Sequence, residues 1–320
     1  MTTPALEPVV ARTSYADLPS TLTTELRAAG LNPEDLYGAV ARAISEDVPG
    51  TDVTSVATIP VDLIGTADLV ARRPGTVAGL AVAELVLRYV VDADVTVERH
   101  VADGDRVEAG AKLLSVSGPV LRLLVAERTT LNYLGRLSGI ATETARWVDA
   151  VAGTAARVRD TRKTTPGWRD LEKYAVRCGG GANHRRSLSD QALVKDNHVL
   201  GAGGVVAAYL AVRERYAGQQ PPLPIQVEVD SLDQLREVLD AGADEVLLDN
   251  MSPEEVAEAV ALTAGRARLE ASGGLDLEVA AAYARAGVDF LAVGALTHSA
   301  RVLDIGMDLR SRTPAGARDG

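Results

Sequence analysis

The sequence has almost no cysteine, and it contains no long apolar run. Its single cysteine, Cys178, excludes an internal disulfide and any metal site built from several thiolates. No stretch reaches the roughly 18 apolar residues of a membrane-spanning helix, and the mean hydropathy is only +0.05. The first residues lack a basic start followed by an apolar block, so we expect no signal peptide. These absences predict a cytoplasmic protein with no membrane partner.

Lysine is also scarce, because 29 of the 33 basic residues are arginine. The 44 acidic residues bring the net charge to −11, which argues against non-specific binding of nucleic acid. The basic charge is uneven, however: residues 157–186 hold nine Lys or Arg and three Asp or Glu, a local balance of +6. A solvated basic face would explain this island, and so would a binding site for an anionic small molecule.

The composition that remains is that of a folded protein, with 47% hydrophobic and 24% charged residues in 320. Residues 1–25 lack clear periodicity and are predicted to be a mobile extension. Helical spacing at 34–45 and 80–91, with short β-like runs between turns, predicts a small α/β sandwich over residues 26–131. We expect the segment 303–320 to return to this domain.

One segment of the sandwich, residues 101–116, resembles the turn and strand pattern of biotinyl and lipoyl carrier domains. Those domains attach their cofactor to a lysine at the tip of a hairpin. Lys112 opens a strand-like run instead, so we expect the segment to be structural, and a carrier is the weakest alternative.

The pattern changes at residue 118. A long helical stretch over 118–152, as one helix or two, precedes strand-like runs that alternate with amphipathic helices. The strands are expected at 155–161, 191–196, 224–230, 244–250, 267–272 and 289–295. Over the last four strands, Val227, Val246, Leu269 and Leu291 follow one another at 19, 23 and 22 residues, as in repeated βα units. The predicted fold is therefore α/β: an N-terminal α/β sandwich followed by an open or incomplete (β/α) barrel of parallel strands over 132–302.

The predicted strands end in polar residues or glycines in a definite order. Arg162, Lys163 and Lys195 follow the first two strands, and Glu228 and Asp249 come at the next two. In a barrel these ends meet on the C-terminal rim, where catalytic groups lie. Glycine-containing turns follow the last two strands and can hold a phosphate through backbone N–H groups; they are Ser272, Gly273, Gly274, Gly294 and Ala295.

The residue types on this rim indicate an anionic ligand. Arginine grips carboxylates through two nitrogens and lysine acts as a point charge, so several of them imply more than one negative charge. His184 and Arg185, in the glycine-rich loop 179–185, extend the set. Glu228 and Asp249 are suited to sugar hydroxyls or to a divalent cation such as Mg²⁺.

Eight motifs, taken in order, resemble the quinolinate phosphoribosyltransferase family, which consists of type II phosphoribosyltransferases. The match runs from about residue 34 to 308. The motifs, between residues 127 and 299, read ERTTLNYLGRLSGIAT, DTRKTTPGWR, GGGANHR, LVKDNH, VEVDS, LLDNM, SGG and GALTHS. Trp168 stands where an aliphatic residue is usual, which leaves the chemistry undisturbed.

This resemblance implies quinolinate and phosphoribosyl pyrophosphate (PRPP) as substrates, with Mg²⁺ and no organic cofactor. The products would be nicotinate mononucleotide, pyrophosphate and CO₂, on the de novo route to NAD. The resemblance also implies a homodimer or a multiple of dimers in which Arg128 reaches into the partner's site. Quinolinate would be held by Arg128, Arg162, His184, Arg185 and Lys195, with Lys163 where the two substrates meet.

Two other interpretations stay open. A transferase of the same fold could act on nicotinate or another ring acid, although a large basic cluster favours a diacid. The chain could also be a non-catalytic sensor of phosphorylated metabolites, which the presence of Lys163, Glu228 and Asp249 argues against.

Overall fold

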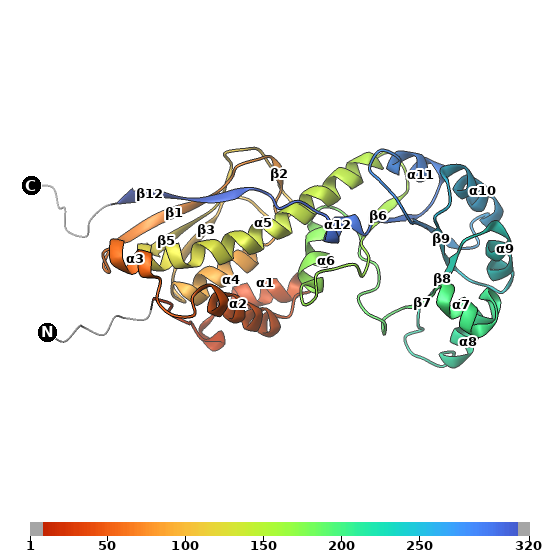
Figure 1. Cartoon of the computed structure of the whole chain (residues 1–320), viewed down its shortest axis with the longest axis horizontal. Coiled ribbons are helices and arrows are strands. Elements are labelled where there is room, and N and C mark those ends of the chain that lie inside the picture. Colours follow the sequence, from red (N-terminus) through yellow and green to blue (C-terminus); the bar gives the residue numbers. More distant parts are fainter. Residues whose placement is uncertain (1–8, 313–320) are drawn as a thin grey trace, which may run out of the picture. The chain divides into compact units, whose positions relative to one another are not determined.

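The computed structural model of the chain describes residues 9–312 (Figure 1). It divides into two compact units. The first comprises the chain up to Thr142, the segment Asp170–Gly179 and the chain from Arg301 onward. The second comprises Glu143–Arg169 and Gly180–Ala300. No helix within the described range is long and apolar enough to cross a membrane.

The first unit is built on an antiparallel sheet of four strands, in the order β12-β1-β5-β3. These strands are β1 (Ile64–Ala71), β3 (Thr96–Arg99), β5 (Lys112–Pro119) and β12 (Ile305–Arg312). A two-stranded ribbon pairs β2 (Gly75–Thr76) with β4 (Arg106–Val107). Because β12 pairs with β1, the end of the described chain returns to this unit. Residues 313–320 of the predicted returning segment lie outside the described residues.

Helices complete the first unit: η1 (Tyr15–Asp17), α1 (Ser20–Ala28), α2 (Pro33–Asp47), α3 (Val53–Thr58), α4 (Leu80–Val90) and most of α6 (Arg169–Cys178). The helix α4 is apolar almost all round, and its Leu85 and Leu87 are fully buried. The long helix α5 (Val120–Ala150) is a single element, and the division between the units falls within it after Thr142. A continuous helix shows no change of pattern at that point, so the predicted division after residue 131 differs from the observed one.

The N-terminal stretch 1–25 contains regular structure that its sequence pattern does not predict. The helix α1 begins at Ser20, and its Leu22 and Leu26 are buried. A spacing of four places both leucines on one helical face, which is the signal that marks this helix. Residues 1–8 lie outside the described residues.

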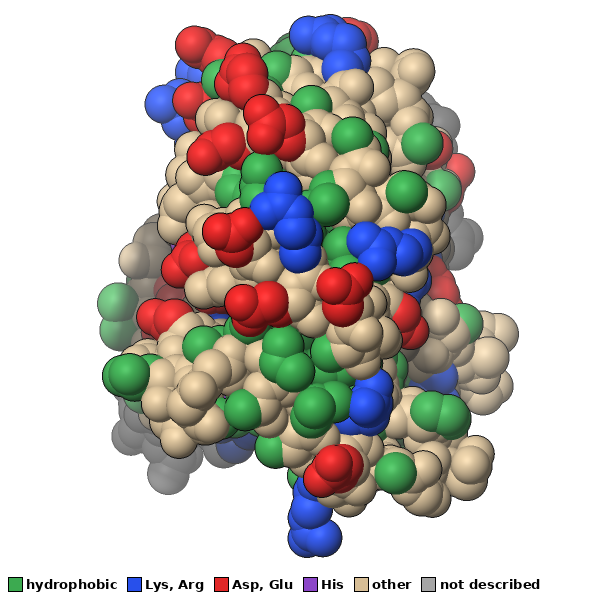
Figure 2. All heavy atoms as spheres, turned by 90° about the vertical axis from the view of Figure 1, so that its right-hand side faces the viewer, with side chains coloured by type: hydrophobic (Ala, Val, Ile, Leu, Met, Phe, Trp, Pro, Cys, Tyr) green, Lys and Arg blue, Asp and Glu red, His purple; other side chains and the backbone are tan. Residues whose placement is uncertain are grey.

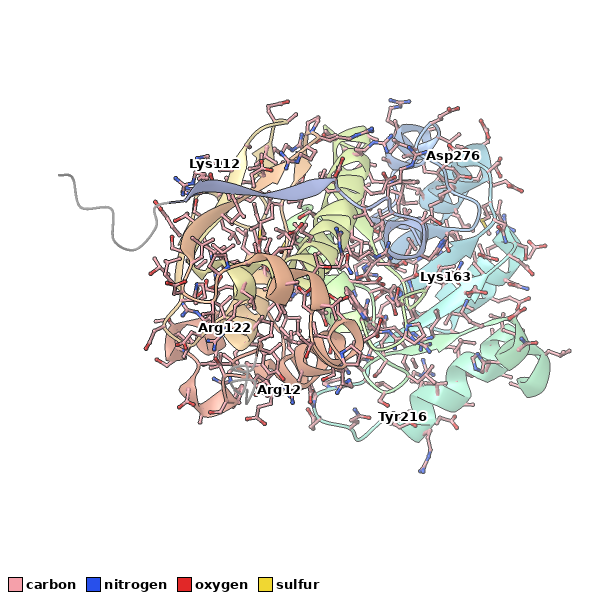
Figure 3. All side chains as sticks on the ribbon, turned by 60° about the vertical axis from the view of Figure 1, so that its left-hand side comes forward. Arg12, Lys112, Arg122, Lys163, Tyr216 and Asp276 are labelled. Carbon is pink, nitrogen blue, oxygen red and sulfur yellow. The ribbon has the colours of Figure 1, made fainter. Side chains whose placement is uncertain are left out.

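A buried acidic side chain explains Lys112, which Figure 3 labels at the sheet of the first unit. Asp68 in β1 is almost fully buried, and its carboxylate lies 2.9 Å from Lys112 Nζ and 2.7 Å from Arg310 Nε. The Ser115 hydroxyl donates a hydrogen bond of 2.6 Å to the same group. Burial alone would raise the pKa of Asp68, but these hydrogen bonds and charges outweigh it and lower the pKa. Lys112 thus stabilises a buried carboxylate, as a structural lysine does.

The second unit is an α/β fold with a parallel sheet of six strands, ordered β6-β11-β10-β9-β8-β7 (Figure 1). The strands are β6 (Arg157–Arg159), β7 (Ala192–Val194), β8 (Ile225–Val229), β9 (Glu245–Asp249), β10 (Arg268–Ser272) and β11 (Phe290–Ala292). The helices are α7 (Asp196–Ala202), α8 (Val205–Arg215), α9 (Leu232–Asp240), α10 (Pro253–Thr263), α11 (Ala280–Ala286) and α12 (Ala295–His298). All six predicted strands are present, each shorter than predicted.

The sheet is open, because β6 and β7 are its edges and no ladder joins them within residues 9–312. A loop takes the place beside β6 instead: Ala182 forms a parallel bridge with Arg159. The helices begin where capping predicts. The Ser231 hydroxyl accepts from the N–H of Gln234, and Ser252 forms a capping box with Glu255. These caps fix where each helix starts, and therefore where the preceding strand-end loop must finish.

Candidate active site

A cavity of about 690 Å³ opens at the carboxyl ends of the parallel strands in the second unit. Its volume is in the range of small-molecule sites. The predicted site residues that line it are Arg162, Lys163, His184, Arg185, Lys195, Asp249, Ser272, Gly273, Gly274, Gly294 and Ala295. Arg128 and Glu228 do not line it. The fold thus brings most of the predicted site residues together in one cavity.

Four cationic side chains line the cavity, compared with two carboxylates, those of Asp249 and Glu270. By contrast, acidic and basic side chains are interspersed on the face of the second unit that Figure 2 shows. Arg162 has a buried Nε with no hydrogen-bond partner in the described part of the chain. Burial and the nearby charge of Arg162 lower the pKa of Arg185. Asp190 offsets only part of this effect, so the two half-buried guanidinium groups form a site suited to an anion.

Lys163 lies on the loop that follows β6, where Figure 3 labels it. Its backbone carbonyl accepts a hydrogen bond of 2.8 Å from the Thr297 hydroxyl in α12. Its side chain runs beside Gly294, where an added Cβ would come within 2.9 Å of Lys163 Cδ. The φ of Gly294 is −66°, an ordinary helical value, so space for Lys163 is the reason for a glycine there.

The glycine-rich loop is fixed by an acidic residue that follows β6. The carboxylate of Asp160, which is fully buried, accepts from the backbone N–H of His184 at 2.8 Å and from Asn183 Nδ2 at 2.6 Å. The N–H of Ala182 also donates to Val158 O at 2.8 Å. These bonds hold His184 at the cavity and order a loop that its glycines alone would leave flexible.

Lys195 and Glu228 form an ion pair between the ends of β7 and β8. The side chain of Glu228 is only 12% exposed, and it lies behind Lys195 instead of on the cavity wall. Lys195 precedes α7, and its backbone N–H donates to His198 Nδ1 at 2.9 Å. The carboxylate thus orients the lysine that the cavity exposes.

At the turn after β10, the backbone of Gly273 lies close to that of Asn250, which follows β9. Gly273 has a φ of +90°, and any side chain there would collide with Asn250, whose own φ is +57°. The N–H of Asn250 donates to Ser272 O at 2.9 Å, and Asn250 Nδ2 donates to Asp249 Oδ2 at 2.7 Å. Glycine is the residue that fits this left-handed turn.

Two further residues at the cavity floor, Gln226 and Glu270, are not predicted from the sequence. Both are fully buried, and Glu270 lines the cavity. The distance from His184 Nε2 is 2.8 Å to Gln226 Oε1 and 3.6 Å to Glu270 Oε1. Their strands carry other polar residues as well, Glu228 in β8 and Arg268 in β10, so no local pattern distinguishes Gln226 and Glu270.

Other candidate groups are not among the residues that line this cavity. Burial in the first unit raises the pKa of Cys178 to about 11, which makes a poor nucleophile. Arg128 is an exposed residue of α5, in the first unit. Within the described residues, no group of three or more His, Cys, Asp or Glu side chains is arranged to hold a metal ion.

Both units match models of known domains. Residues 52–138 match the N-terminal domain of quinolinate phosphoribosyl transferase, and residues 140–308 match its C-terminal domain.

Solved and curated relatives agree with this match. The nicotinate-nucleotide pyrophosphorylase (carboxylating) of Mycobacterium leprae is 52% identical over 275 residues, covering 84% of this chain and 95% of that protein. The structure of NadC from Streptococcus pyogenes is 40% identical with a TM-score of 0.82, covering 88% of this chain and 99% of that one. The nicotinate-nucleotide pyrophosphorylase from Francisella tularensis is 34% identical with a TM-score of 0.81, covering 87% and 96%. The chain therefore belongs to the quinolinate phosphoribosyltransferase family.

Proposed function

We propose that this chain transfers the phosphoribosyl group of PRPP to quinolinate and releases CO₂. The products are nicotinate mononucleotide and pyrophosphate, and the reaction is a step of de novo NAD biosynthesis. The cavity of the second unit carries this proposal, because four cationic side chains line it and the reaction needs a site for two polyanions.

Quinolinate is a ring with two adjacent carboxylates. Arg162, Arg185 and Lys195 supply the charges that hold them, and the ring of His184 lines the same cavity. Nicotinate has one carboxylate and would leave part of this charge unmatched, so the number of cations favours the diacid.

PRPP takes the side of the cavity formed by the later strands. The turns at Ser272–Gly274 and Gly294–Ala295 offer backbone N–H groups to its 5′-phosphate. Asp249 accepts hydrogen bonds from the ribose hydroxyls. Glu228 acts indirectly, through its ion pair with Lys195. Lys163, beside Gly294, reaches the place where the two substrates meet.

The chemistry follows from this arrangement of charge. The pyridine nitrogen forms a bond to the anomeric carbon while the bond to pyrophosphate breaks, and nearby carboxylates stabilise the oxocarbenium-like transition state. The ring nitrogen is then positively charged. It stabilises the electron pair left on C2 when the adjacent carboxylate leaves as CO₂, and a proton takes that position. Positioning and electrostatics supply the rate, and no protein nucleophile takes part.

The residues present fit Mg²⁺ that arrives with PRPP. Asp249 lines the cavity, but Glu228 is already paired with Lys195, so these carboxylates alone do not make a complete metal site. Mg²⁺ usually keeps several waters and binds through one or two carboxylates together with substrate phosphates. Asp249 would hold the ion together with the substrate phosphates, and the ion would neutralise charge on the leaving pyrophosphate.

We also propose a shared site in a homodimer, in which Arg128 of one subunit contacts quinolinate in its partner. The exposure of Arg128 on α5 supports this. It leaves the guanidinium available to an intermolecular ligand.

The test is direct. Purified protein with quinolinate, PRPP and Mg²⁺ should release nicotinate mononucleotide and CO₂ in equal amounts, detected by chromatography and by ¹⁴CO₂ from labelled quinolinate. Nicotinate offered in competition should react far more slowly. A well-folded protein that prefers nicotinate, or that turns over neither acid, would contradict the proposal.

A further inference from the structure

A buried polar layer lies beneath the cavity of the second unit. It consists of Arg159 in β6, Gln226 in β8, Glu245 in β9 and Glu270 in β10. Arg159 Nη1 donates to Glu245 Oε1 at 2.9 Å and to Glu270 Oε2 at 2.6 Å. Burial would lower the pKa of Arg159, but the two carboxylates outweigh it and raise the pKa. Arg159 therefore stays charged and holds one oxygen of Glu270 in place.

The orientation of Gln226 follows from Glu270. Gln226 Nε2 donates to Glu270 Oε2 at 3.1 Å, so its Oε1 points toward His184 Nε2, at 2.8 Å. The reversed amide would set an oxygen against the carboxylate and lose a hydrogen bond between fully buried groups, which is costly. The second oxygen, Glu270 Oε1, has no hydrogen-bond partner in the described part of the chain and lies 3.6 Å from the same His184 nitrogen.

His184 Nε2 therefore faces two acceptors, Gln226 Oε1 and Glu270 Oε1. We propose that Gln226 and Glu270 are positioning residues: they fix His184 as the Nε2–H tautomer and hold the plane of its ring at the cavity wall. The consequence for substrate rests on the proposed function. A ring locked in this way contacts quinolinate without losing rotational freedom on binding, so the layer contributes to affinity and leaves the chemical step itself to other residues.

The tautomer can be measured without substrate. In protein labelled with ¹⁵N-histidine, a long-range ¹H–¹⁵N spectrum of the neutral ring distinguishes the nitrogen that carries the proton from the one that does not. The signals of His184 are those that disappear in His184→Gln. We expect a protonated Nε2 and an unprotonated Nδ1. A ring protonated at Nδ1, or a mixture of both forms, would overturn the proposal whether or not the chain turns over quinolinate.

Variants test the cause. Gln226→Met keeps the volume but removes the acceptor, and we expect a mixture of tautomers and a KM for quinolinate raised about tenfold, the cost of one buried hydrogen bond, with kcat changed less than the KM. Glu245→Gln is the matched control, because Glu245 also binds Arg159 but does not contact His184. It should leave the tautomer unchanged. An unchanged tautomer in Gln226→Met, or a mixture in Glu245→Gln as large as in Gln226→Met, would show that Gln226 does not fix the ring.

Discussion

Arg162 and Arg185 lie close enough together that the charge of the first lowers the pKa of the second. Such repulsion costs free energy in the protein without ligand, and a bound dianion removes that cost. The same charges are less useful to a monoanion. This repulsion predicts that the cavity prefers two carboxylates on one ring, for an electrostatic reason that does not depend on its shape.

This preference predicts the effect of unreactive analogues. Phthalate has the adjacent carboxylates of quinolinate without the ring nitrogen, so it should bind and raise Tm, while benzoate should do so much less. At a concentration of 100 times Kd, binding adds about 2.7 kcal/mol to the free energy of unfolding. Differential scanning fluorimetry on the wild type and on Arg162→Gln measures this. Equal shifts from the two acids, or an undiminished shift in Arg162→Gln, would argue against a diacid site.

Lys163 should be needed for turnover and dispensable for folding, because its side chain makes no ion pair within residues 9–312. We expect Lys163→Ala to lower kcat by about 10²- to 10³-fold, as the loss of one transition-state charge does, with circular dichroism and Tm unchanged. Arg236→Ala is the control: it removes one positive charge from the exposed surface of α9 and should be fully active. Activity near the wild-type level in Lys163→Ala would remove Lys163 from the mechanism.

At the scale of elements, the turn between β11 and α12 shapes the cavity by the absence of a side chain. Gly294→Ala keeps an allowed φ but adds a Cβ within 2.9 Å of Lys163 Cδ and 3.2 Å of His298 Nε2. The lysine must move, and a displacement on the order of 1 Å can cost about 10²-fold in rate. Steady-state kinetics should therefore show a large loss with little change in the free energy of unfolding. In Gly218→Ala, where the added Cβ meets nothing within 4 Å, neither quantity should change. A fully active Gly294→Ala would contradict this role of the turn.

The strands and most helices of the second unit can be predicted because their signals are local. A strand covered on both faces reads as an apolar run, and caps such as Ser252 act within one turn. The helix α6, which lies mostly in the first unit, is harder to predict from the sequence. Basic residues alternate there with the buried Leu171, Ala175 and Val176. The polar floor of Gln226 and Glu270 depends on which strands become neighbours, which no local pattern contains. The same limit applies to Glu228, whose position behind Lys195 arises only in the folded sheet.

At the scale of the whole molecule, the family relation covers both units, but the cavity draws its lining from the second alone. If the proposed dimer shares its sites, a residue of the first unit must act in the partner. Arg128 is the candidate, because it is exposed and carries the charge that a quinolinate carboxylate needs.

A mixing experiment tests that arrangement. Arg128→Ala and Lys195→Ala should each be inactive alone, since each removes a cation from every site. A heterodimer of the two has one doubly altered site and one intact site. After random exchange of subunits, about a quarter of the wild-type activity should therefore return. Two affinity tags and native mass spectrometry verify the exchange.

The control for this experiment mixes Lys163→Ala with Lys195→Ala. Both residues line the cavity of one subunit, so every site in their heterodimer keeps one defect and no activity should return. Recovery in the first mixture alone would place Arg128 in the partner's site. Verified exchange without recovery would mean that Arg128 acts within its own subunit or outside the reaction, and the shared site would have to be abandoned while the chemistry proposed for the second unit stood.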